Sequence, residues 1–184
     1  NSIAHILADR LGRISFVLPQ GASKGARMRN AIFMPLSLIE FEAKILPSKD
    51  LHTFRDARST YLLTDIYCDP TKNAIAMFMS ELLTRSIHES EENLPLFKFI
   101  QSSIIHLNNM ETGIANFHIW FLYNLGAFLG IQPDIESYED GYWFDMANGI
   151  FTPERPSHTH YLSPKEAPVI LLLSRMTSKN LQHF

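Results

Sequence analysis

Four short stretches of the first sixty residues have the apolar patterns of strands, and turn-forming residues separate them. They are Ser2–Ala8, Arg13–Leu18, Met34–Lys44 and Leu51–Ser59. The first two are rich in apolar residues and the last two can be divided into two alternating faces, so each stretch is predicted to be a β-strand. The residues Asp9–Gly12 predict a tight turn that joins the first two strands into a hairpin. Four antiparallel strands favour a small barrel or sandwich, and one further strand would give the five of an OB-fold barrel.

The apolar spacing becomes helical near Asp69. Asp69 followed by Pro70 is typical of an N-cap and a first helical position, and it predicts a helix over Thr71–His88. Similar spacing predicts helices over Leu94–Asn108 and Thr112–Phe128. The last of these is apolar on nearly all sides, which predicts a central, buried helix.

Two local signals organise the C-terminal part of the chain. The pair Asn148 and Gly149 lies in a four-residue connection between apolar runs, which predicts a hairpin near residues 142–152. The segment Ser163–Glu166 has the sequence of a capping box, and it predicts a helix that continues to about Met176.

These elements predict an α+β protein of two domains. We expect an OB-fold barrel over residues 1–66 and a mostly α-helical domain with a small hairpin over residues 67–184. The chain begins and ends within regular patterns. We therefore expect a piece of a longer protein that lacks the first strand of the barrel and is truncated at the C-terminal end.

Charge is distributed unevenly along the chain. The net charge is −3, but residues 1–60 hold nine Lys and Arg against five Asp and Glu, whereas residues 61–184 hold seven against fourteen. This split predicts two modules with different partners. Cys68 is the single cysteine, which excludes an internal disulfide and any zinc site with two cysteine ligands. No signal peptide or membrane span is predicted, and we expect a cytoplasmic protein.

The segment between Leu18 and Ile32 is rich in cations and has no acidic residue. It carries Lys24, Arg27 and Arg29 among small and polar residues. A cationic loop between strands favours contact with phosphate groups. The alternative is a solvated surface loop whose charges only aid solubility.

Candidate catalytic chemistry is sparse. His158 and His160 form the only close histidine pair, with Asp145 and Glu154 near in sequence, but surface or packing roles are favoured over a metal site. No phosphate-binding loop, nucleophile elbow or dinucleotide fingerprint is present. A hydrolase that uses Cys68 is the weakest alternative. No catalytic residue, metal or cofactor is predicted.

Four segments in this order resemble the bacterial recombination mediator family RecO, in the version that lacks the zinc-ligand cysteines. They are Leu11–Phe16, Pro35–Glu40, Ala115–His118 and Leu129–Pro133. The resemblance implies an N-terminal OB-fold and a helical C-terminal domain. It implies a non-enzymatic, nucleoid-associated role in recombinational repair: binding single- and double-stranded DNA, annealing strands and helping to load recombinase. Implied partners are RecR and the acidic C-terminal tail of the single-stranded-DNA-binding protein.

By position, the loop cations match the DNA-contacting loop of this family, and cations on neighbouring strands extend the predicted interface. The predicted nucleic-acid contacts are Lys24, Arg27, Arg29, Arg13, Arg55, Arg58 and Lys49. Phenylalanines on the same strands could stack on bases, but core packing is favoured for each of them. These are Phe16, Phe33 and Phe54.

The chain departs from the family pattern in two places. Many relatives carry zinc ligands where this chain has its hairpin, and we expect aromatic packing by Tyr142, Trp143, Phe144 and Phe151 to replace the metal. Some relatives also bind the acidic tail through arginines on the central helix, but Ile119–Phe128 contains no cation. Other cations, such as Arg85, Lys98 or Arg175, would have to receive the tail.

A second function remains open from the sequence alone, namely a protein-interaction scaffold whose barrel binds a protein and not DNA. Salt dependence distinguishes the two, because phosphate binding weakens steeply as salt rises.

Overall fold

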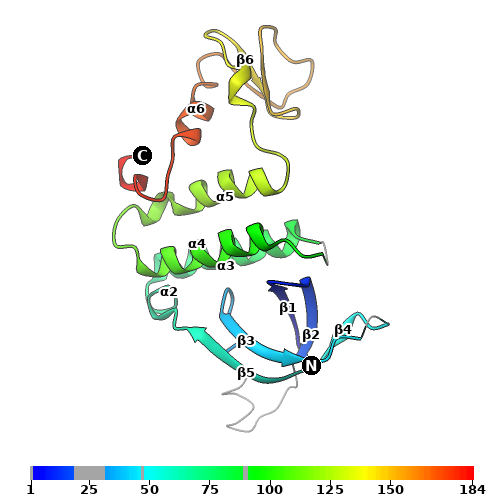
Figure 1. The fold of residues 1–184 in the computed structure, drawn as a ribbon. Helices are drawn as coiled ribbons and strands as arrows, with labels where there is room; N and C mark the ends of the chain where they lie inside the picture. The colour runs from blue at the N-terminus through cyan, green and yellow to red at the C-terminus, as the bar shows by residue number, and fades with distance from the viewer. Residues whose placement is uncertain (1, 19–31, 47, 89–90) are drawn as a thin grey trace. The chain divides into compact units, whose positions relative to one another are not determined.

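The computed structural model describes residues 2–18, 32–46, 48–88 and 91–184 (Figure 1). It is a mixed α+β structure of two compact units, Asn1–Met110 and Glu111–Phe184. The boundary predicted between residues 66 and 67 falls within unit 1, in helix α2 (Thr64–Cys68), and it stays a prediction.

The described strands of unit 1 form two separate sheets (Figure 1). Strands β1 (Ser2–Ala8) and β2 (Gly12–Leu18) form the predicted hairpin, with Ser2 opposite Leu18, and β4 (Leu51–His52) lies parallel to β2. Strands β3 (Leu38–Ala43) and β5 (Phe54–Tyr61) make an antiparallel pair. Among the described residues these sheets do not close into a barrel.

Strand β3 is shorter than its predicted range, Met34–Lys44. The backbone N–H of Ser37 donates to the Met34 carbonyl at 3.0 Å, and Leu36 has a φ of 62°. A left-handed residue in a turn cannot continue an extended strand, so β3 begins only at Leu38. The predicted strand Leu51–Ser59 is likewise divided, because β4 and β5 belong to different sheets.

An aromatic cluster forms the core between the two sheets of unit 1. Phe16 on β2 is 0% exposed, and its ring centroid lies 5.0 Å from that of Phe41 on β3 and 6.2 Å from that of Phe54 on β5. Phe33 packs in turn against Phe54 at 4.7 Å. Core packing, the favoured role for Phe16, Phe33 and Phe54, is therefore the one that the structure supports.

Helices α2, α3 (Pro70–Ser86) and α4 (Leu94–Asn109) complete unit 1. The predicted N-cap of α3 is confirmed, since the Asp69 carboxylate accepts from the backbone N–H groups of Thr71 and Lys72 at 2.7 and 3.0 Å. Lys72 is buried, and its Nζ donates to the Asn108 carbonyl at 2.7 Å. This contact satisfies a carbonyl at the end of α4 and ties the start of α3 to it.

In unit 2, a 3₁₀ turn η1 (Ile114–Asn116) precedes helix α5 (Phe117–Phe128). The helix therefore begins later than predicted, because Gly113 adopts a φ of 71°. Phe121 is fully buried, but Leu122 is 47% exposed, so the apolar helix buries one face and leaves apolar side chains exposed on another. No described helix of the protein has both the length and the apolar character needed to cross a membrane.

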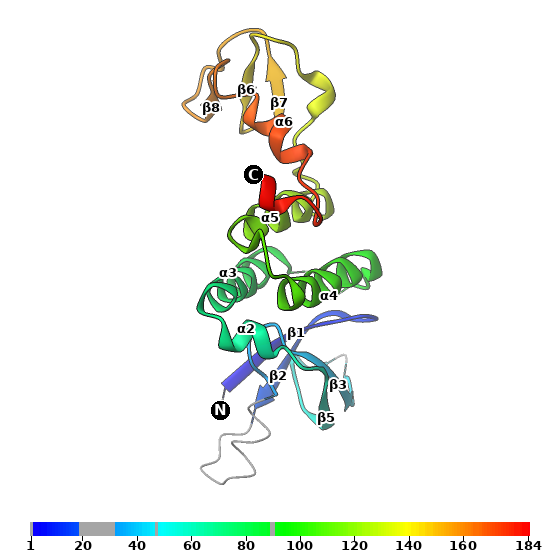
Figure 2. The same ribbon diagram turned by 90° about the vertical axis from the view of Figure 1, so that its left-hand side faces the viewer.

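The C-terminal part of unit 2 is a small sheet with a helix packed on it (Figure 2). Its strand order is β7 (Ile150–Thr152), β6 (Trp143–Asp145) and β8 (Tyr161–Leu162). The predicted hairpin with a connection over residues 146–149 is confirmed, whereas β8 lay outside the prediction.

An apolar core holds this sheet together. Phe144 and Phe151 are 4% exposed, and their ring centroids lie 4.8 Å apart. Ala167 and Ile170, from the segment that ends in helix α6 (Val169–Ser174), are buried in the same cluster, and Tyr142 packs against it. The expected aromatic packing is present, although Trp143 lies on the opposite face of the sheet.

The capping-box residues make contacts but do not begin a helix. The Glu166 carboxylate accepts from the backbone N–H and the hydroxyl of Ser163, at 3.0 and 2.6 Å. Turn residues follow, and α6 covers only Val169–Ser174, so the predicted start at Ser163 is wrong. The remaining 3₁₀ turns are η2 (Ile135–Ser137) and η3 (Leu181–His183).

Candidate nucleic-acid interface

A bulge in β5 places two predicted DNA contacts on the same face of a sheet. Glu40 on β3 pairs with Arg58, and Glu42 pairs with Arg55, so one residue of β3 between these pairs opposes two of β5. The extra residue is Asp56, which has a φ of 49°. Regular alternation placed Arg55 and Arg58 on opposite faces. Glu40 and Glu42 lie on the same, exposed face of β3. Because paired residues share a face of the sheet, the bulge brings Arg55 and Arg58 to that exposed face as well.

The acidic partners of these arginines are exposed as well. Arg58 donates from Nε and Nη2 to one oxygen of Glu40, at 3.1 and 2.8 Å, and the two side chains are 74% and 61% exposed. Such a pair contributes little stability, about 0–1 kcal/mol, so Arg58 can exchange Glu40 for a phosphate at small cost. Arg55 has no ion pair among the residues that the structure describes.

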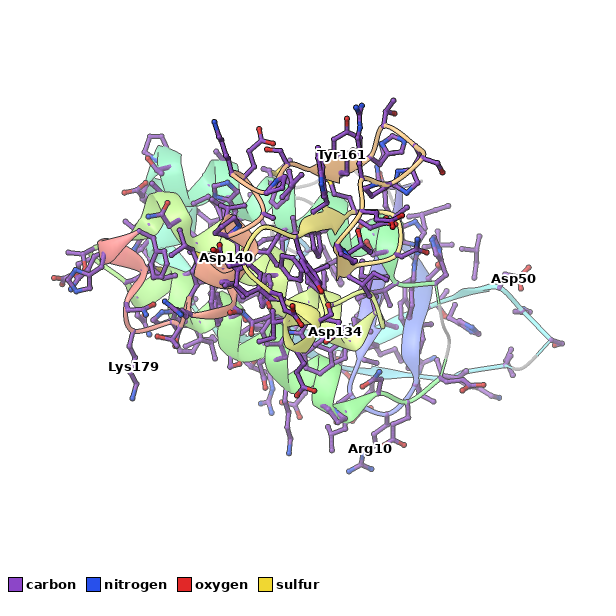
Figure 3. All side chains as sticks on the ribbon, turned by 90° about the horizontal axis from the view of Figure 1, so that it is seen from above. Arg10, Asp50, Asp134, Asp140, Tyr161 and Lys179 are labelled. Atoms are coloured by element: carbon purple, nitrogen blue, oxygen red, sulfur yellow. The ribbon has the colours of Figure 1, made fainter. Side chains whose placement is uncertain are left out.

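Two lysines lie at the end of the same strand pair. Lys44 follows the last residue of β3, and Lys49 lies in the connection toward β4 and β5, where its backbone N–H donates to the Leu46 carbonyl. Asp50, the next residue, directly precedes β4 and is labelled in Figure 3. Ala43 pairs with Phe54, so Lys44 and Arg55 are at one end of the pair. Lys44, Lys49 and Arg55 form what we call the basic strand end, and all three residues are exposed.

The three loop cations lie outside the described residues. Lys24, Arg27 and Arg29 belong to the segment that follows Leu18, the last residue of β2. Strand β2, which precedes this segment in the sequence, pairs with β4, Ser15 with Leu51 and Phe16 with His52.

Arg13 has a different environment from the other predicted contacts. Its Nη1 donates to the backbone carbonyls of Thr84 and Ile87, at 2.8 and 2.7 Å, where helix α3 ends. Cations are favourable at a helix C-terminus, because carbonyl groups there lack helical partners. Arg13 thus joins β2 to α3, and it is not brought together with the basic strand end.

A buried carboxylate, which the sequence indicated only as a neighbour of the histidine pair, organises the hairpin of unit 2. Asp145 is 6% exposed, and it accepts from the backbone N–H groups of Ala147 and Asn148 and from the Asn148 side chain, at 2.8, 3.0 and 2.8 Å. The Nε2 atom of His158 lies 3.2 Å from the same carboxylate. The local signal for this arrangement is an Asp at the first position of the turn, where it can bond to the backbone two residues on.

The same residues give no support to a metal site. The ring centroids of His158 and His160 are 6.1 Å apart, and the backbone N–H of His160 donates to Nδ1 of His158. Within the described part of the chain, no three His, Cys, Asp or Glu side chains are grouped as metal ligands. Cys68 is exposed at the end of α2.

The hydrogen bond from the Asn148 side chain lowers the pKa of Asp145, and the backbone N–H groups and His158 add to this effect against the opposing effect of burial. The Ser163 hydroxyl similarly lowers the pKa of Glu166. A lowered pKa stabilises the fold above the unfolded value of about 4, and this contribution is lost as the pH falls through the folded value. We therefore expect the thermal midpoint to fall between about pH 5 and pH 2.

Asp145→Asn should lose part of this acid dependence and retain the part due to Glu166. Thermal unfolding followed by circular dichroism across that pH range measures the difference. Parallel curves for the variant and the wild type would contradict the assigned role of Asp145.

The cations considered for the acidic tail are dispersed. Arg85 pairs with Glu81 one turn earlier on α3, at 2.8 Å. Lys98 on α4 and Arg175 after α6 are exposed. Arg85 and Lys98 belong to unit 1, and Arg175 belongs to unit 2.

Comparison with known proteins identifies the family. The family model described as "Recombination protein O C terminal" matches residues 68–183. The chain is 40% identical to DNA repair protein RecO of Bacteroides fragilis over 185 residues, which covers 100% of this chain and 76% of the relative. It is 38% identical to the RecO protein of Phocaeicola vulgatus and 33% identical to that of Porphyromonas gingivalis, with the same coverage. The resemblance inferred from the motifs is confirmed, and the chain belongs to the RecO family of DNA repair proteins.

Proposed function

We propose that this chain binds single- and double-stranded DNA without reading sequence, promotes annealing of complementary strands, and helps to load recombinase onto single strands. The observation that carries the proposal is the basic strand end, where Lys44, Lys49 and Arg55 are all exposed. We propose that Lys24, Arg27 and Arg29, which follow β2 in the sequence, add to this surface. Family membership supports a role in DNA repair.

The proposed mechanism is neutralisation of phosphate charge. Lysine and arginine contacts to phosphates release condensed counterions and do not depend on base sequence. When two strands occupy the same basic surface, their mutual repulsion decreases and pairing becomes easier. Arg58 contributes after leaving Glu40. Arg13 can contact DNA only if it leaves the carbonyls of Thr84 and Ile87, so we place it last among the proposed contacts.

We further propose that the strands of unit 1 belong to an OB-fold barrel. The free edges of β1 and β3 both line a groove of about 870 Å³, which also contacts apolar residues of α3 and α4 such as Leu83 and Ile100. Strands β4 and β5 divide what the sequence predicted as one strand, so a further strand between these edges would complete a barrel of five. This chain spans 76% of the length of the Bacteroides fragilis relative.

The acidic part of the chain is proposed to bind protein partners. The acidic balance of residues 61–184 suits protein partners, for which RecR and the tail of the single-stranded-DNA-binding protein are our candidates. In this proposal the protein is not an enzyme, and it acts in the cytoplasm at the nucleoid. We retain residues 1–66 and 67–184 as its proposed domains.

Binding of a labelled single-stranded oligonucleotide, measured by fluorescence anisotropy against salt concentration, tests the proposal. We expect the logarithm of the binding constant to fall linearly with the logarithm of the salt concentration, by about 0.7 for each phosphate contacted. Absence of binding at low salt would exclude the DNA role and favour the protein-interaction scaffold. Tight binding that does not respond to salt would exclude phosphate contact as its main source.

A further inference from the structure

The small sheet of unit 2 has an aromatic outer face. Trp143 and Asp145 share one side of β6, and the pairing of Asp145 with Tyr161 puts Tyr161 on that side too. Phe144, between them, points to the apolar core on the other side. The Trp143 and Tyr161 rings meet edge to face with centroids 5.1 Å apart, and both residues are partly exposed.

An arginine lies on this aromatic face. The segment 153–160 connects β7 to β8, and it places the Arg155 guanidinium 4.9 Å from the centroid of Tyr161 and 5.9 Å from that of Trp143. Contact with two rings holds the guanidinium plane in position, while Arg155 remains exposed. We call Trp143, Tyr161 and Arg155 the stacking platform.

The hydrogen-bond donors of the stacking platform have no partner among the residues that the structure describes. No hydrogen bond or ion pair to another described residue engages the Arg155 guanidinium, the Trp143 indole N–H or the Tyr161 hydroxyl. All three groups can donate hydrogen bonds. The Asp145 carboxylate on the same side of the sheet bonds to the Ala147 backbone and the Asn148 side chain, at 2.8 Å each, and not to these three groups.

We propose that the stacking platform is a second contact site for DNA, which binds a single strand through base stacking on Arg155 and the two rings and through donation to the adjoining phosphate. This inference rests on the proposed function. Planar guanidinium groups and aromatic rings bind unstacked bases without sequence preference, and bases in a duplex are not available to them. An acidic peptide would need the charge of Arg155 but not the rings.

The chain has two tryptophans, so a Trp120→Phe variant of the whole chain leaves Trp143 as the only indole. Its emission is titrated with an oligothymidylate of about 20 nucleotides, longer than the site size of one strand-binding fold. Anisotropy of the same labelled oligonucleotide measures total binding in parallel. We expect saturable quenching of Trp143 with the midpoint found by anisotropy.

In this background, Arg155→Ala should remove the quenching and weaken binding about tenfold, within the range for loss of one stacking contact. The matched control Lys179→Ala removes one exposed cation from the same unit and should change affinity less than about twofold (Tyr161 and Lys179 are labelled in Figure 3). If Arg155→Ala unfolds the sheet, Arg155→Lys replaces it. That variant keeps the charge but not the plane, and it should bind at least about threefold more weakly.

The outcomes separate the two proposals. Binding seen by anisotropy without a change in Trp143 emission would overturn the stacking platform and leave the proposed function standing. Absence of any binding at low salt would overturn both. Quenching by polyglutamate but not by oligothymidylate would assign the site to acidic peptides. If Arg155→Lys bound DNA with wild-type affinity, Arg155 would contribute only its charge, and base stacking on its guanidinium would be excluded.

Discussion

Replacing Lys24, Arg27 and Arg29 together by alanine is expected to weaken single-stranded DNA binding about a hundredfold at a salt concentration of about 0.1 M. Each lost phosphate contact flattens the log–log salt dependence by about 0.7, so three contacts flatten it by about 2. Because counterion release favours binding more strongly at lower salt, the loss should grow as salt falls. Anisotropy titrations of variant and wild type over a range of salt concentrations measure both quantities.

A control variant removes the same charge elsewhere. Arg10→Ala/Lys165→Ala/Lys179→Ala takes three exposed cations from outside the segment 19–31, and it should leave the slope unchanged. If both triple variants reduce the slope equally, net charge and not a located surface governs binding. If neither reduces it, the loop makes no phosphate contact, and the basic strand end would have to bind DNA by itself.

Phe16→Ala is expected to destabilise unit 1 by about 3–5 kcal/mol, the cost of removing a large aromatic ring from a packed core. Phe16 is fully buried, and its ring meets those of Phe41 and Phe54 from the opposing sheet. Its loss would leave a cavity where the two sheets join. The midpoint of urea unfolding, followed by circular dichroism, measures the change.

Ile3→Ala is the matched control, because Ile3 lies on the neighbouring strand β1 but is 53% exposed. It should change stability by no more than about 0.5 kcal/mol. Phe16→Leu separates packing from base stacking, since it keeps an apolar side chain and removes the ring. Unchanged DNA affinity of folded Phe16→Leu is the expected result, and a large loss would contradict a purely structural role.

Several elements follow from residues close together in sequence, and these were predicted well. The turn at Gly12 joins two alternating runs, and its φ of 64° is one that glycine adopts without strain. Asp69 bonds to amides two and three residues later in the chain. The connection over residues 146–149 is equally local. Such contacts need few neighbours, so a sequence pattern is sufficient to predict them.

The candidate site depends on contacts that no local pattern contains. The register of β3 against β5 decides that Arg55 and Arg58 share a face, and the carbonyls at the end of α3 engage Arg13 from more than seventy residues away. Likewise, Trp143 and Tyr161 lie together under Arg155 only because β6 pairs with β8, which comes later in the chain.

The sequence by itself determined the family, the uneven distribution of charge, the caps and turns, and the residue types able to bind phosphate. The tertiary structure alone decided which of those cations are exposed together and which are engaged in packing. The physical reason is that a charged side chain has the same local signal whether it faces solvent or bonds to a distant carbonyl. Its role depends on the free energy of contacts between segments far apart in the chain.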